Sequence, residues 1–65
     1  MNKHFIEISL KSYRKRVEYE KNRAIKAVQE NNLTTAVLSV TEAARLQAVI
    51  EELEFILEDM EASND

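Results

Sequence analysis

The sequence contains no glycine and no proline. Tight turns that need a positive φ usually use glycine, and β-hairpins need such a turn at nearly every reversal. A β fold of 65 residues without either residue is improbable, whereas the interior of a helix needs neither. The absence of both residues predicts an all-α protein.

Cysteine is also absent, which excludes disulfides and thiolate metal sites. The chain has no apolar run of the roughly 20 residues that span a bilayer, and Glu7 and Ser9 interrupt the N-terminal segment where a signal peptide would be continuously apolar. We therefore expect a cytoplasmic protein with no membrane contact.

Residues that commonly carry catalysis are sparse. His4 is the only histidine, so the serines have no second histidine that could activate them as nucleophiles. No glycine-rich loop is present to bind phosphate. The carboxylates lack the nearby histidines of di-metal bundle sites. We expect no enzyme activity, no metal and no cofactor.

The apolar residues of both halves recur at helical spacing. One stripe starts at Ile6 and a stronger one runs from Ala43 to Met60, interrupted in the first half by Glu20. These stripes predict an antiparallel hairpin that forms a single domain, with a first helix at about 3–30 and a second at about 35–61, followed by a frayed tail at 62–65.

Asn31 and Asn32 are the best loop residues in the chain. Asparagine tolerates the left-handed conformation that ends a helix, so a turn is expected at about 31–34 with Thr34 or Thr35 as the next N-cap. A later start is also open, because the residues from Ser39 to Glu42 match a capping box. The alternative to a turn is one continuous helix of roughly 90 Å.

A wide apolar stripe suits a bundle better than two helices alone. A chain this short also buries little surface as a monomer. We therefore predict that two hairpins dimerise as a four-helix bundle. Near the turn the facing residues are expected to be small: Ala24, Ala27, Val28, Ala36, Val40 and Ala43. The expected oligomer core comprises Ile6, Leu10, Tyr13, Val17, Leu46, Val49, Ile50, Leu53, Ile56, Leu57 and Met60.

Charge divides between the halves. Residues 1–32 hold eight Lys and Arg against four Glu, a net of +4, and residues 33–65 hold Arg45 against eight acids, a net of −7. The basic cluster could contact phosphates and favours nucleic-acid binding as an alternative function, although the net charge of −3 weakens that attraction. The residues of this alternative are Lys11, Arg14, Lys15 and Arg16.

Phe55 lies away from the apolar stripe, between two rows of acidic residues. Tyr19 and Ile8 also lie off the stripe of the first half. An aligned set of exposed apolar residues indicates a second contact face, so we expect a small interaction protein, which resembles in size and build the bacteriophage or bacterial regulators that inhibit a larger target. The candidate residues for contact with an unidentified protein partner are Phe55, Tyr19, Glu51, Glu54 and Glu58.

Overall fold

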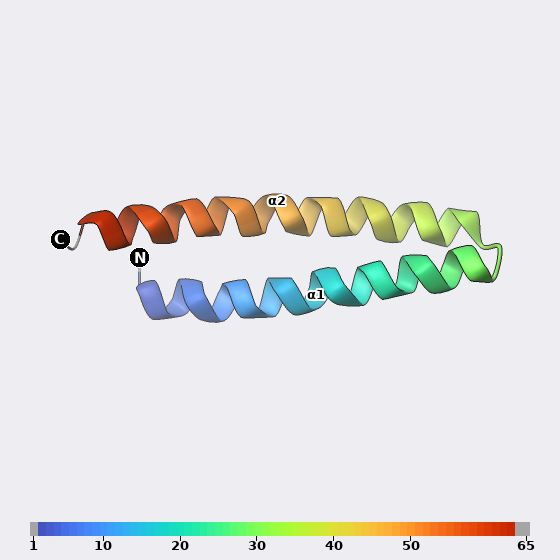
Figure 1. The fold of residues 1–65 in the computed structure, drawn as a ribbon, viewed down its shortest axis with the longest axis horizontal. Coiled ribbons are helices and arrows are strands. Elements are labelled where there is room, and N and C mark those ends of the chain that lie inside the picture. Colours follow the sequence, from blue (N-terminus) through green and yellow to red (C-terminus); the bar gives the residue numbers. More distant parts are fainter. Residues whose placement is uncertain (1, 64–65) are drawn as a thin grey trace.

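A computed structural model describes residues 2–63, which form a hairpin of two helices, α1 (Lys3–Gln29) and α2 (Leu33–Ser63). The helices lie antiparallel, with the start of α1 and the end of α2 at the same end of the molecule, where α2 extends past α1 (Figure 1). The molecule measures 52 × 15 × 14 Å. A single continuous helix would be nearly twice as long, so the predicted reversal and the all-α hairpin are confirmed.

The turn is made by two asparagines that end one helix and start the next. Asn31 has a φ of 59°, the left-handed conformation that terminates a helix. Its backbone N–H donates to the Val28 carbonyl at 3.0 Å, and that of Asn32 donates to the Ala27 carbonyl at 2.7 Å. These two bonds form a Schellman motif, which satisfies carbonyls that the end of α1 would otherwise leave free.

Asn32 also caps the second helix. Its side-chain Oδ1 accepts a hydrogen bond from the Thr35 backbone N–H at 3.2 Å, and its carbonyl accepts one from Ala36 at 3.1 Å. The expected N-cap at Thr34 or Thr35 is therefore wrong, and so is the later start at Ser39. One residue serves both helices, which shortens the connection.

The other two helix ends are closed differently. The side chain of Asn2 caps α1 by accepting from the His4 N–H at 2.8 Å. At the far end, Ala62 and Ser63 continue α2, and the Ser63 hydroxyl donates to the Asp59 carbonyl at 2.8 Å. The tail that was expected to fray at 62 is thus helical to Ser63, and residues 64–65 lie outside the described part.

Within residues 2–63, neither helix has the length and apolarity needed to cross a membrane.

The core is a narrow seam in which spacings of three and four residues alternate along both helices. This is the periodicity of a coiled coil, in which each helix offers two positions of every seven to its partner. In α1 the seam comprises Ile6, Leu10, Tyr13, Val17, Glu20, Ala24 and Ala27. In α2 it comprises Ala36, Ser39, Ala43, Leu46, Ile50, Leu53, Leu57 and Met60.

Most of the residues expected to form an oligomer core lie in this seam within a single hairpin. Five of them are buried, namely Ile6, Leu10, Val17, Leu46 and Ile50. Tyr13, Leu53, Ile56, Leu57 and Met60 are partly buried against those five, and Val49 remains 39% exposed. A contact between two hairpins must therefore also use side chains that lie outside the seam.

Near the turn the seam is built from small residues, as the sequence suggests for Ala24, Ala27 and Ala36, which are buried. Val28 and Val40 differ from that expectation, because each is 58% exposed. Both lie beside the seam rather than in it. Two helices cover only the central positions of a wide stripe, and the flanking positions stay uncovered.

Two polar side chains occupy seam positions. Glu20 falls where the α1 stripe needs an apolar residue; its side chain is 15% exposed and its Oε1 lies 3.7 Å from Arg23 Nη1. Ser39 is 1% exposed. Both the buried Glu20 Oε1 and the Ser39 Oγ lack a hydrogen-bond partner among residues 2–63. Both of these unsatisfied atoms lie in the half of the seam nearer the turn.

Candidate interaction surface

The two sides of the hairpin can be identified from the ion pairs that join the helices. Arg14 Nη2 lies 2.8 Å from Glu54 Oε2 on one side of the seam. Arg16 Nη2 lies 3.8 Å from Glu42 Oε1. Arg14 and Arg16 diverge by about 200° around α1, so the second pair marks the opposite side.

Seven-residue steps extend the first side toward the turn, because a coiled coil repeats its faces every seven residues. From Arg14 these steps lead to Lys21 and Val28, and from Glu54 they lead back through Gln47 to Val40 and Leu33. The row changes character along its length. The row is ionic near the open end of the hairpin and apolar near the turn.

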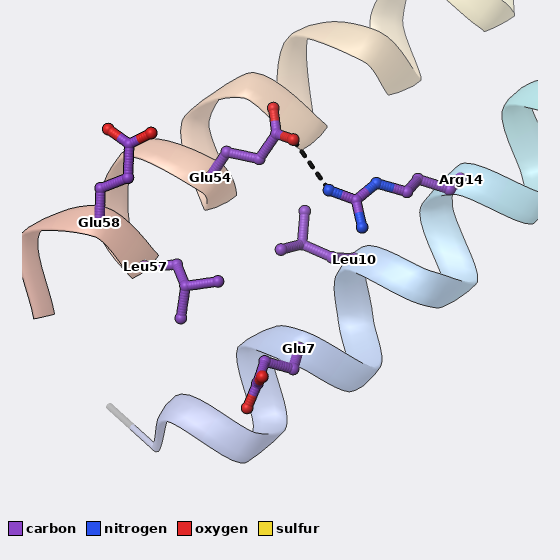
Figure 2. A pocket seen from close by; sticks show the side chains of 6 residues that line it. All are labelled: Glu7, Leu10, Arg14, Glu54, Leu57 and Glu58. Atoms are coloured by element: carbon purple, nitrogen blue, oxygen red, sulfur yellow. Dashed lines mark hydrogen bonds and ion pairs between the residues drawn. The ribbon is translucent and has the colours of Figure 1, made fainter. Parts of the chain in front are cut away.

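A series of depressions follows this same side. The first is lined by residues of both helices around the Arg14–Glu54 pair, and Leu10 and Leu57 project toward one another between the helices there (Figure 2). The next shares Arg14 and Glu54 with it, and the third shares Lys21 and Gln47 with the second and reaches Val40 and Ala44. Together they form a shallow groove, hereafter the groove side.

Beside the turn the groove side carries a set of exposed apolar residues that we name the turn patch. Val37 lies four residues after Leu33 and three before Val40, and Ile25 lies three before Val28, so these side chains share a face on each helix. Each is between 58 and 63% exposed. The turn patch consists of Ile25, Val28, Leu33, Val37 and Val40.

The turn patch can be identified from the sequence only in part. Val28 and Val40 are expected on the facing side, and Ile25 and Leu33 receive no role. A signal was present: Leu33 and Val40 are seven residues apart, which defines a second apolar row beside the seam. It was obscured because the first half of α2 is apolar on several sides, with Leu38 also 62% exposed.

The residues expected to contact a protein partner do not form one cluster. Phe55 is 70% exposed and Tyr19 is 65% exposed. Tyr19 lies level with the middle of α2, however, more than two helical turns from Phe55 along the rod. Around Phe55, Glu54 pairs with Arg14, whereas Glu51 and Glu58 make no ion pair among residues 2–63.

The basic cluster is partly engaged by the hairpin itself. Arg14 pairs with Glu54, and the Arg16 guanidinium lies 5.4 Å from the Tyr13 ring centroid besides its pair with Glu42. Lys11 and Lys15 stay exposed beside Glu18. The cations predicted for nucleic acid are thus shared between the acidic arm and solvent.

Within residues 2–63 no group of three or more His, Asp or Glu side chains is placed to hold a metal ion.

Comparison of the chain with protein-family models, with curated protein sequences and with solved structures finds no match.

Proposed function

We propose that this protein is a non-enzymatic protein–protein interaction module that assembles with itself through the turn patch, forming a four-helix bundle from two hairpins. The observation that carries this proposal is the exposure of five aliphatic side chains on one continuous face. Soluble monomers rarely expose contiguous apolar patches that are not used for binding. The first half of α2, apolar on several sides, is typical of a helix buried between neighbours.

The magnitudes favour a dimer whose population depends on concentration. Covering the exposed part of each turn-patch side chain contributes about 1 kcal/mol, and a symmetric pair contributes this from both copies. Association costs about 4–15 kcal/mol in lost translational and rotational freedom. The two quantities are of the same order, so we expect a measurable equilibrium between monomer and dimer.

Light scattering across a concentration series tests the proposal. The chain has a mass of 7.5 kDa, and we expect the measured mass to rise toward twice that value. Val37→Glu places a charge in the turn patch and should abolish the rise. Ile8→Glu is the matched control: Ile8 is 55% exposed but lies in α1 near the end of the hairpin away from the turn patch, so it should leave assembly intact. A mass of 7.5 kDa at every concentration would refute the proposal.

We further propose that the assembled module binds a larger protein, in the manner of a small phage-type inhibitor, through the surface around Phe55. Phe55 is exposed, and the neighbouring Glu51 and Glu58 make no ion pair within residues 2–63. This surface therefore offers a partner both apolar and ionic contacts. Glu51 and Glu58 accompany Phe55 on this surface, whereas Tyr19 lies elsewhere on the rod and Glu54 is paired with Arg14. Phe55→Ala should abolish capture of a protein from a lysate while the light-scattering mass is unchanged. Equal capture by both proteins would refute the role of Phe55.

A further inference from the structure

We infer that the two hairpins pair with their turns at the same end, so that α1 of each copy lies along α2 of the other. This inference rests on the proposed function, since it names the partner on the groove side as a second copy and fixes its orientation. Two hairpins stacked face to face through one side have only two symmetric arrangements. In one, the turns coincide and α1 lies on the partner's α2. In the other, the turns are at opposite ends and like helices stack.

The position of the turn patch distinguishes these arrangements. With the turns together, Ile25 lies level with Val37 of the partner subunit and Val28 with Leu33 of the partner subunit, because both hairpins share one register. Apolar side chains then cover apolar side chains. With the turns apart, Val37 and Val40 would instead lie against the carboxylate-rich end of the partner subunit's α2. That contact would desolvate charges without pairing them, which is costly.

Charge on the groove side favours the same arrangement. Along this side α1 carries Lys11, Arg14 and Lys21 against Glu7 and Glu18, which is a net charge of +1. The corresponding face of α2 carries four glutamates and no cation, a net of −4, from Glu51, Glu54, Glu58 and Glu61.

Stacking α1 on the partner's α2 sets a positive face against a strongly negative one. Lys11 then lies level with Glu51 of the partner subunit. With the turns at opposite ends, these glutamates would instead lie level with Val37 and Val40 of the partner subunit, where they meet no cation. The apolar pattern and the pairing of Lys11 with a glutamate both favour the arrangement with coincident turns.

Disulfide trapping tests the orientation directly, because the chain has no cysteine of its own. Ile25→Cys and Val37→Cys are made in separate chains, one of them with an affinity tag, and the two are mixed under a glutathione redox buffer. With coincident turns, the mixed disulfide should form on the order of 100-fold faster than the same thiols react when the dimer is dissociated by dilution, since a complex gives them a millimolar effective concentration. Light scattering first establishes that each variant still dimerises.

The competing arrangement has its own diagnostic pair. Val37→Cys mixed with Glu58→Cys should cross-link only if the turns lie at opposite ends, because those residues lie at opposite ends of α2. Preferential formation of the 37–58 disulfide would overturn the inference. Dimers that trap neither pair would also overturn it while leaving the proposed function standing. A monomeric mass before any trapping would refute the proposed function and this inference together.

Discussion

Arg14 and Glu54 are forty residues apart in the sequence, yet their side chains meet at 2.8 Å across the groove side of the hairpin. The pair fixes which turn of α1 lies beside which turn of α2, since a shift of one helical turn would separate the two groups by about 5 Å. Both side chains remain substantially exposed, at 56% and 45%. The contact therefore contributes more to register than to stability.

Reversing one charge of this pair should destabilise the hairpin slightly, and reversing both should restore it. Arg14→Glu and Glu54→Arg are each expected to lower the free energy of unfolding by no more than about 1 kcal/mol, because solvent screens an exposed pair. The double variant tests coupling, measured by urea denaturation at one chain concentration. A double variant as unstable as the sum of the single ones would show that the two residues are not coupled.

Asn31 should become more favourable as glycine. It holds a φ of 59°, a conformation that costs roughly 1–2 kcal/mol for a residue with a Cβ and less for asparagine. Asn31→Gly should therefore raise the melting temperature by a few degrees, while Asn31→Ala should lower it. Asn22→Gly is the control, because Asn22 lies in the middle of α1, where the same substitution should destabilise. Equal effects at the two positions would contradict the assigned turn.

The double role of Asn32 predicts a specific sensitivity to substitution. Asn32→Ala removes the side-chain acceptor of the Thr35 N–H and should cost about 1 kcal/mol of unfolding free energy. Asn32→Asp keeps an acceptor oxygen and should retain most of the stability. Thr34→Ala and Thr35→Ala test the sequence-based alternative; each should stay within about 0.5 kcal/mol of the parent. A larger loss at Thr35 than at Asn32 would restore the threonine cap.

Glu20 occupies a seam position with a side chain only 15% exposed. Glu20→Leu should raise the free energy of unfolding by about 1–2 kcal/mol, because leucine can bury its side chain there without leaving a polar atom unpartnered. Asn22→Leu, on the exposed face of the same helix, should change stability by no more than about 0.5 kcal/mol. Chemical denaturation monitored by circular dichroism measures both. If Glu20→Leu destabilises the protein, the carboxylate has a role that the hairpin alone does not explain.

Ser39 provides a parallel test on α2. Its buried Oγ has no hydrogen-bond partner in the described part of the chain, so Ser39→Ala should stabilise the protein by about 1 kcal/mol. Ser12→Ala, at an exposed position of α1, should have an effect within about 0.5 kcal/mol. Destabilisation by Ser39→Ala would indicate that the hydroxyl acquires a partner on assembly.

The turn could be predicted from the sequence because its chemistry is local. Without glycine, Asn31 was the residue best able to take a positive φ, and the structure places that conformation there. The predicted start of the second helix, at about residue 35, was wrong by two residues for an equally local reason. Of two adjacent asparagines, the first can end one helix and the second can cap the next. A threonine cap is needed only if the connection between the helices is longer.

The turn patch could not be predicted in full because it depends on how wide a seam one helix covers. Val28 and Ala27 are neighbours in sequence, and either could face α2 if the stripe is judged alone. The long-range contact decides between them: Ala27 is 4% exposed and Val28 is 58% exposed. A helical wheel shows which residues share a face, but the register between two helices determines which of those residues are covered.

The hairpin places the start of α1 and the end of α2 far from the turn patch. α1 begins and α2 finishes at one end of a rod 52 Å long, and the turn patch lies beside the opposite end (Figure 1). A dye, tether or fused domain attached near Asn2 is thus held well away from Val37. If the molecule were immobilised through that attachment, the turn patch would remain exposed to the surrounding solution.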